Sequence, residues 1–190
     1  MTTILEGLIT TLDEGGTVHV TPMGPEVDGL PETLVLKPFP GRTHDNLART
    51  GQAVFHVGDA MRLFVAGTLG RVPPDEPTLP AETVAGRVLA SCCRYYELTV
   101  IDRDRGTPRE RFVCRVTRTG TLREFFGFSR AKHAILEACI LASRRHMIPA
   151  GTLADEIGRL APLVDKAGSA ADVAAWTELL AALDLDPPTL

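Results

Sequence analysis

The sequence lacks a hydrophobic run of the about 18 to 20 residues that a membrane-spanning helix needs. Its first residues, MTTILEGLITTLDEGG, contain no basic segment followed by an apolar one, so they do not predict a secretory signal peptide. Basic residues are not in excess either: the net charge is -4, whereas nucleic-acid-binding proteins usually carry a positive surplus. We therefore expect a cytoplasmic protein that acts on neither a membrane nor a nucleic acid.

Several catalytic and ligand-binding motifs are also missing. No G-x-G-x-x-G, Walker or G-x-S-x-G pattern occurs, so neither a Rossmann nucleotide site nor a hydrolase elbow is supported. The cysteines, Cys92, Cys93, Cys114 and Cys139, include no C-x-x-C pair, and the five histidines are scattered. We expect no metal site, and we interpret the cysteines as small buried hydrophobic residues in a reducing compartment.

Aromatic residues make up only 5% of the chain, so the core must consist mainly of aliphatic side chains. Short apolar alternation and turn signals in the first two thirds of the chain are typical of β-strands. The expected strands cover residues 5–12, 17–24, 32–39, 52–58, 93–105 and 109–120, with a helix over 42–50 that ends at Gly51. Residues 60–70 fit either a helix or a strand, and the proline-rich residues 71–80 predict a loop or an extended linker.

From Ser129 onward the apolar residues follow a helical period. Thr152 and Ser169 are expected to begin two further helices, because each is a capping residue with an aspartate three positions later. Strands in one part of a chain and helices in the other predict an α+β protein rather than a doubly wound sheet. The expected organisation is an antiparallel β unit over residues 1–125 and a C-terminal helical segment, residues 126–190, packed on it.

The stretch FPGRTHDNLART, residues 39–50, contains the strongest candidate ligand site. A helix start leaves about four backbone N–H groups without intrahelical partners and carries a partial positive charge. The side chains and backbone that would add to it belong to Lys37, Gly41, Arg42, Thr43 and Asn46. Together they predict a phosphate site. The same residues are also explained by Thr43 as an ordinary helix N-cap beside a solvated Arg42.

Two other stretches leave alternatives open. HVTPMGP, residues 19–25, places a proline in a strand, which marks a sheet edge or a bulge whose freed backbone groups suit a flat heterocycle. The same stretch is also explained as an ordinary strand end. GFSRAKHA, residues 127–134, gathers Arg130, Lys132 and His133 at the start of a helix, which is the unfavourable end for cations. They bind an anionic ligand, form a solvated basic turn, or pair with carboxylates.

His44 precedes Asp45 in the expected helix. Consecutive side chains on a helix diverge, so we do not expect a His–Asp dyad. No other residue stands out as a catalytic acid or base.

The order EGLITT, VTPMG, LKPF, GRTHDNL, AVFHV resembles the FMN-binding split-barrel superfamily, which includes flavin reductases and pyridoxamine-phosphate-oxidase-like proteins. In flavin-reductase-like members a Pro-containing strand end is followed by a T-x-x-N-[IL] helix start, which Thr43, Asn46 and Leu47 match. Over residues 3–150 the chain also resembles a domain-of-unknown-function family of flavoprotein-like proteins from archaea and some bacteria. Its members carry GFNRAKHAVLEA, which reads GFSRAKHAILEA here, with Ser129 in place of Asn.

The resemblance implies an antiparallel split barrel that binds FMN, with the phosphate near the start of helix 42–50 and the flavin ring against the backbone of the VTPMG strand. The residues implied in FMN binding are Thr21, Pro22, Met23, Lys37, Arg42, Thr43, Asn46, Leu47, Arg130 and Lys132. A homodimer is also implied, with the flavin near the subunit interface. Arg130 and Lys132 would then reach a flavin site in the same or the partner subunit.

The function that follows from the resemblance is that of an FMN-dependent oxidoreductase or flavin reductase with a small-molecule redox partner such as NAD(P)H. Three alternatives stay open. They are a non-catalytic flavin or nucleotide carrier, an accessory protein in pterin-linked one-carbon metabolism, and a dimeric scaffold with an empty pocket.

Overall fold

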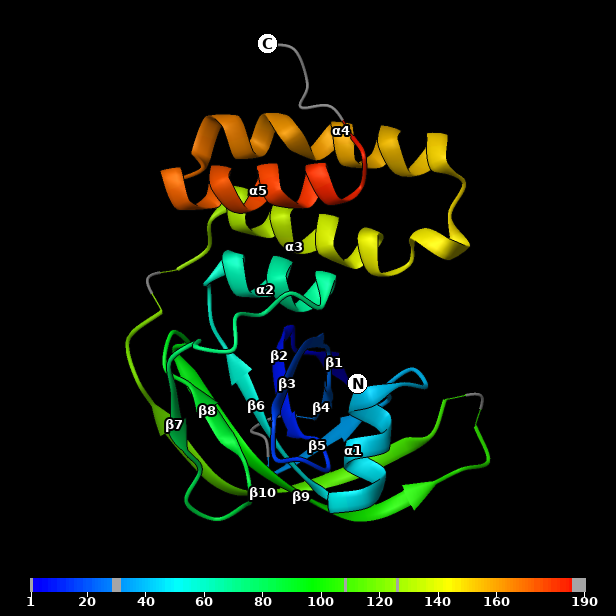
Figure 1. The fold of residues 1–190 in the computed structure, drawn as a ribbon, viewed down its shortest axis with the longest axis vertical. Helices are drawn as coiled ribbons and strands as arrows, with labels where there is room; N and C mark the ends of the chain where they lie inside the picture. The colour runs from blue at the N-terminus through cyan, green and yellow to red at the C-terminus, as the bar shows by residue number, and fades with distance from the viewer. Residues whose placement is uncertain (1, 29–31, 108, 126, 186–190) are drawn as a thin grey trace. The chain divides into compact units, whose positions relative to one another are not determined.

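The computed structural model describes residues 2–28, 32–107, 109–125 and 127–185. Contacts divide the chain into two compact units: Met1–Gly58 with Pro73–Phe125, and Asp59–Val72 with Phe126–Leu190. The first unit holds the sheets and the second is helical, so the expected α+β class is confirmed (Figure 1). Residues 59–72 thus group with the later helices, although they interrupt the β unit in the sequence. Packing of the helical segment on the barrel stays a prediction.

The first unit is built on one eight-stranded antiparallel sheet. Its strands are β1 Thr3–Ile4, β2 Gly7–Leu12, β3 Val18–Met23, β4 Glu26–Val27, β5 Thr33–Leu36, β6 Gln52–Val57, β9 Arg94–Asp104 and β10 Arg111–Thr121. The spatial order β1-β4-β5-β10-β9-β6-β2-β3 places β3 at an edge, as the proline in HVTPMGP predicts. Pro22 faces Leu8 across the β2–β3 hairpin without a break in the register.

The core of this unit is mainly aliphatic, with a few aromatic rings. Its buried cluster contains Ile9, Val27, Leu34, Leu36, Leu47, Ala53, Phe55, Tyr96, Leu98, Phe112 and Cys114. One helix, α1 (Arg42–Thr50), joins the cluster through Leu47, whose side chain is 1% exposed. The helix ends at Gly51, as the sequence predicts, and this glycine adopts a left-handed conformation with φ 64°. Leu47 therefore anchors α1 on the sheet and fixes where the start of the helix lies.

Part of the proline-rich segment forms a strand, so the loop or extended linker expected over residues 71–80 is wrong at its end, where the chain pairs in a sheet. β7 (Thr78–Pro80) pairs with β8 (Arg87–Leu89) in a separate two-stranded sheet. Pro80 is the last residue of β7, and both strands of a two-stranded sheet are edge strands, where a missing N–H is tolerated. A high proline content in this segment therefore does not exclude a short strand.

A buried carboxylate, Glu97 on β9, holds the turn of the β7–β8 hairpin. It accepts hydrogen bonds from the Glu82 N–H at 2.9 Å, the Thr83 N–H at 2.5 Å and the Thr83 hydroxyl at 2.6 Å. Burial by itself raises the pKa of Glu97, but these hydrogen bonds and Arg118 outweigh it and lower the pKa below its ordinary value. The carboxylate therefore stays ionised and structural.

A fully buried histidine, His56 on β6, links three strands of the first unit. Its Nδ1 lies 3.2 Å from the Leu8 carbonyl on β2, and its Nε2 lies 3.0 Å from the Leu89 N–H on β8. Because a backbone N–H only donates, Nε2 accepts and Nδ1 carries the proton. Burial lowers the pKa of His56 to about 4, although the Leu8 carbonyl opposes this shift. His56 is thus a neutral side chain that connects β2, β6 and β8 by hydrogen bonds.

The second unit contains α2 Met61–Leu69, α3 Arg130–Ser143, a short 3-10 helix Arg145–Met147, α4 Ala150–Ala167 and α5 Ala170–Ala182. The ambiguous segment 60–70 is therefore a helix. The start of α4 expected at Thr152 is wrong, because Pro149 occupies the N-cap position and the helix begins directly after it. The start expected at Ser169 is confirmed by a capping box with Asp172.

The helices of this unit pack through small and aliphatic side chains. The buried face of α3 consists of Ala131, Ala134, Ile135, Ala138, Cys139 and Ala142. No helix in the described part of the chain is long and apolar enough to cross a lipid bilayer.

Candidate functional site

The start of α1 has an open backbone conformation that only glycine adopts easily. Gly41, at the N-cap, has φ 143° and ψ -168°, and no described side chain caps the helix. The first intrahelical bond runs from the Asp45 N–H to the Gly41 carbonyl at 2.9 Å, so the preceding N–H groups of the first turn are not used within the helix. Thr43 as an N-cap is wrong, since it lies inside the first turn and is 7% exposed.

Arg42 extends from this helix start toward the β2–β3 hairpin. Its side chain is 63% exposed, and Nη2 lies 3.5 Å from Oδ2 of Asp13 in the hairpin turn. His19, on β3, lies in the same field: burial and the neighbouring Arg42 lower its pKa, while Asp13 opposes the shift. The guanidinium is therefore only weakly engaged and keeps donors for an anion.

An aromatic side chain lies just before the helix start. Phe39 is 56% exposed, and the guanidinium of Arg109 lies over its ring at 4.7 Å. This second exposed cation follows β9 in the sequence, far from Arg42 along the chain. The segment that leads into α1 thus presents a ring and a guanidinium to solvent.

Asn46 and Arg49 attach α1 to the hairpin. The Asn46 amide donates to the Thr11 hydroxyl at 3.0 Å, and its oxygen accepts from Arg49 Nη2 at 3.2 Å. Arg49 also donates to the Leu12 carbonyl. Asn46 therefore positions the helix with one N–H and its oxygen, and its role toward a ligand stays a prediction.

The opposite side of α1 is attached to the β9–β10 hairpin through His44. Its Nδ1 lies 3.0 Å from Asp45 Oδ1, so the expectation of no His–Asp pair is wrong: the two side chains bend toward each other at the helix start. Its Nε2 lies 2.9 Å from Glu110, which Arg103 also binds at 2.7 Å. Hydrogen bonds to Asp45 and Glu110 raise the pKa of His44 against burial.

Glu110 is the centre of this attachment. Arg103, with help from His44 and Arg105, holds the pKa of Glu110 down to about 2. Arg103 also donates to the Ala48 carbonyl in α1 at 3.2 Å. His44, Glu110 and Arg103 are thus all hydrogen-bonded to neighbouring groups. The cluster attaches α1 to the β9–β10 hairpin and provides no free catalytic acid or base. No local signal in the sequence predicts it, because Glu110 lies 66 positions after His44.

The strand expected to face the flavin ring lies at the far end of the same hairpin. Thr21, Pro22 and Met23 are half-buried on β3, opposite Ile9, Leu8 and Gly7 of β2. A strand rises by about 3.3 Å per residue, so Pro22 lies about 10 Å along β3 from His19, which neighbours Arg42. The expected phosphate position, near His19, and the expected ring position, at Pro22, therefore lie along the same strand. Contact of either part with flavin stays a prediction.

The remaining expected site residues already have partners in the protein. Lys37 forms an ion pair with Glu26 at 2.5 Å. Lys132, in the second unit, pairs with Asp59 at 2.8 Å, so at least this cation of the RAKHA motif follows the carboxylate-pairing alternative. Arg130 is exposed on the first turn of α3. The reach of these two residues toward a flavin stays a prediction.

The cysteines are all free and buried, as expected. Burial raises the pKa of Cys114 to about 12 and that of Cys139 to about 11, so both are protonated thiols. Among the described residues no group of three His, Cys, Asp or Glu side chains is placed to hold a metal ion.

Two family models match nearly the whole sequence. One, described as the N-terminal domain of a protein of unknown function (DUF447), matches residues 5–123, and another, described as a protein of unknown function (DUF447), matches residues 129–181. The chain belongs to the DUF447 family. The expected family resemblance is thereby confirmed, and the junction between the two DUF447 models falls at residues 124–128. A search of curated proteins found no match.

Solved structures confirm the split-barrel fold of this DUF447 chain. An FMN-bound DUF447 protein from Methanosarcina mazei superposes with a TM-score of 0.81 at 21% identity, covering 94% of each chain. The flavin reductase of styrene monooxygenase from Pseudomonas putida S12 has a TM-score of 0.51 at 20% identity, over 61% of this chain and 78% of its own. Flavoredoxin from Methanosarcina acetivorans has a TM-score of 0.51 at 13% identity, over 62% and 68%.

Proposed function

We propose that the first unit binds FMN, with the flavin phosphate at the start of α1. The observation that carries this proposal is the likeness, over 94% of both chains, to a DUF447 protein whose structure contains FMN. The helix start suits a phosphate, because its first N–H groups have no described side-chain cap and Arg42 is exposed beside them. The Thr43 hydroxyl in the first turn is a further donor.

The length of the hairpin also suits FMN. A phosphate at α1 and a ring at Thr21, Pro22 and Met23 are separated by about 10 Å along β3, on the strand rise of about 3.3 Å per residue. Half-buried backbone on an edge strand offers hydrogen-bonding groups to the polar edge of the ring. Leu47 contributes by anchoring α1, since its own side chain is buried in the core.

The bound flavin would make the protein an oxidoreductase or flavin reductase, since flavins carry hydride and electron transfer while the protein supplies binding and orientation. The similarity to a flavin reductase and a flavoredoxin supports this part of the proposal. NAD(P)H is the proposed small-molecule electron donor. The chain's own contribution is to hold the phosphate at the start of α1 and the ring at β3.

The first experiment is the absorption spectrum of the purified protein, followed by mass identification of the released ligand. Visible flavin absorption and a released mass equal to FMN support the cofactor. Anaerobic bleaching by NADH or NADPH supports the oxidoreductase, and a stable flavin spectrum without bleaching indicates a carrier instead. A colourless protein that takes up no added FMN would indicate the empty scaffold.

A pair of variants tests the phosphate position. Arg42→Gln combined with Thr43→Val should lower FMN affinity strongly, because each charge-assisted hydrogen bond contributes about 1.5 to 3 kcal/mol. Arg159→Gln is the matched control, since Arg159 is an exposed arginine of α4 whose partner Glu156 lies on the same helix. Full FMN content in the double variant would show that the phosphate binds elsewhere.

The subunit arrangement is also a proposal. We propose a cytoplasmic homodimer with the flavin near the interface, where Arg130 and Lys132 of the second unit contribute. Sedimentation of a monomer at micromolar concentration, with FMN still bound, would contradict the interfacial site.

A further inference from the structure

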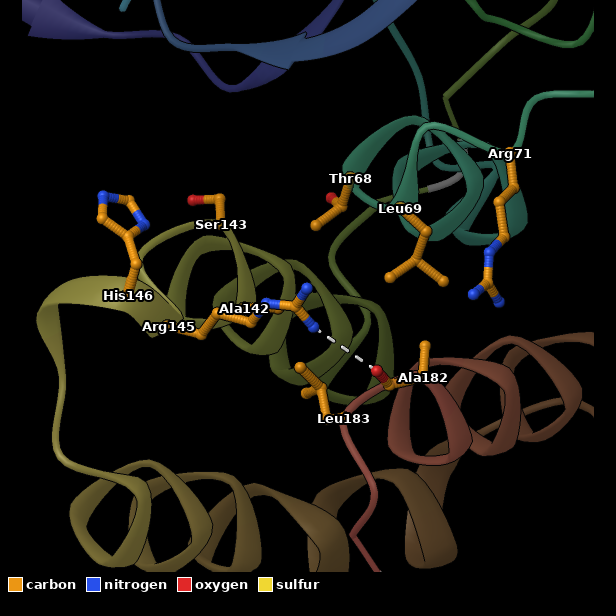
Figure 2. Close-up of a pocket in the computed structure, with 9 residues that line it drawn as sticks. All are labelled: Thr68, Leu69, Arg71, Ala142, Ser143, Arg145, His146, Ala182 and Leu183. Atoms are coloured by element: carbon orange, nitrogen blue, oxygen red, sulfur yellow. Dashed lines mark hydrogen bonds between the residues drawn. The ribbon is translucent and has the colours of Figure 1, made fainter.

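The second unit contains a polar hollow of about 450 Å³. Figure 2 shows that side chains from three helix C-terminal regions line it: Thr68 and Arg71 at the end of α2, Ser143 and Arg145 at the end of α3, and the last residues of α5. His146 follows on the 3-10 helix. A hollow of this size lies within the range of small-molecule sites. None of these residues belongs to the flavin site proposed above.

The cations around the hollow have no carboxylate partners in the described part of the chain. No ion pair joins Arg71, Arg145 or His146 to an Asp or Glu, and the lining contains neither residue type. The cations Lys132 and Arg159 of the same unit, by contrast, are paired. Arg71 and Arg145 therefore bring positive charge to the hollow that no carboxylate of the described residues compensates.

The helix ends account for part of this charge. Each C-terminus carries a partial charge of about -0.5, so the three ends total about -1.5 before screening by solvent. Arg145 offsets one of them directly, since its Nη1 lies 3.5 Å from the Ala182 carbonyl of α5. The charge of the two guanidiniums exceeds the sum of the partial charges at the helix ends. The hollow is therefore net positive.

The hydroxyl groups indicate what else a ligand must carry. The Thr68 hydroxyl donates to the Phe64 carbonyl, and the Ser143 hydroxyl donates to the Ile140 carbonyl, each at 2.7 Å. Since both protons are used, the two oxygens face a ligand as acceptors. A matching ligand combines anionic oxygens for the arginines with O–H or N–H donors for the hydroxyl oxygens.

We propose that this hollow binds a small organic phosphate, with its phosphate on Arg71 and Arg145 and its hydroxyl groups on Thr68 and Ser143. The phosphate oxygens accept from the two guanidinium forks, which are suited to such geometry. The site is independent of flavin and gives the helical unit a binding role of its own.

Ribose 5-phosphate is a suitable probe, with ribose as the uncharged comparison. Titration should shift the ring resonances of His146 in NMR spectra with ribose 5-phosphate but not with ribose. Arg71→Gln with Arg145→Gln should weaken binding by about tenfold or more, whereas Arg159→Gln should not change it. The arginines are solvent-exposed, so folding of the variants is expected and a thermal melt checks it.

The outcomes separate this hollow from the flavin site. If the Arg42→Gln variant still binds ribose 5-phosphate and shows the same His146 shift, the hollow is a separate site, whether or not FMN binds at α1. Absence of any His146 shift at millimolar ribose 5-phosphate would overturn the proposal. Equal affinity in the Arg71→Gln, Arg145→Gln variant would overturn it as well, because the anion would then bind elsewhere.

Discussion

The guanidinium of Arg42 lies 3.5 Å from the carboxylate of Asp13, where α1 begins beside the β2–β3 turn. The other carboxylate oxygen of Asp13 accepts the Thr17 N–H at 2.8 Å, so the turn holds this side chain in place. A phosphate at the start of α1 would share Arg42 with Asp13 and would be repelled by it. The pair therefore opposes the proposed anion binding.

Replacing Asp13 with Asn should tighten FMN binding several-fold. The amide oxygen still accepts from Thr17, while the negative charge beside Arg42 disappears. An exposed charge pair of this kind is worth up to about 1 kcal/mol, and added salt should shrink the difference. Titration of the FMN-free protein with FMN, followed by flavin fluorescence at low and high salt, measures the effect. Asp155→Asn, on the exposed face of α4, is the matched control. Unchanged or weaker affinity in Asp13→Asn would argue against a phosphate beside Arg42.

The hydroxyl of Thr43 should matter more to the ligand than to the fold. Thr43→Val keeps the shape of this 7% exposed side chain and removes its hydroxyl, whereas Thr43→Ser keeps the hydroxyl. We expect Val to weaken FMN binding about tenfold and Ser to retain most of it. Equilibrium dialysis against FMN measures the affinities, and urea unfolding of the FMN-free proteins measures stability. Equal FMN affinity in both variants would remove Thr43 from the site.

Lys132 should act mainly on the stability of the helical unit. Lys132→Gln leaves the Asp59 carboxylate, 13% exposed, without the ammonium that lies 2.8 Å away. Loss of one partner of such a pair costs about 1.5 to 3 kcal/mol. Thermal unfolding should show a lowered midpoint, with Lys166→Gln on the exposed face of α4 as the control. A strong loss of FMN affinity at unchanged stability would instead favour the contact between Lys132 and flavin that the resemblance implies.

His56 should make the protein less stable as the pH falls from about 6.5 to 4. The unfolded chain takes up a proton near pH 6.5, whereas burial keeps the folded pKa at about 4, so acid favours unfolding within this window. The full effect is on the order of 3 kcal/mol and is complete below the folded pKa. His44 acts in the opposite direction, because its raised pKa contributes stability that is lost as the pH rises above 6.5.

Urea midpoints measured between pH 7.5 and 5 for the wild type and His56→Gln test this prediction. The Gln amide can still donate to Leu8 and accept from Leu89, so the variant should fold and show a flatter pH dependence. A slope as steep as that of the wild type would assign the acid sensitivity to other groups.

Local sequence signals predicted the elements that depend on neighbouring residues. The β2–β3 hairpin, the end of α1 at Gly51 and the capping box of Ser169 are all short-range features, and the structure contains each of them. Segment 60–70 stayed ambiguous because a short apolar run fits a buried helix and a buried strand equally well. Its helix packs among α3 and α5, which lie far along the chain.

The sequence by itself determined an α+β chain with an anion-ready helix start after a strand, because turn, cap and periodicity signals act within a few residues. Only the tertiary structure decided which groups face that start. Asp13 reaches Arg42 across 29 positions and Glu110 reaches His44 across 66, through strand pairings that no local pattern encodes. The hollow between Arg71 and Arg145 likewise exists only because the ends of separate helices meet in the folded unit.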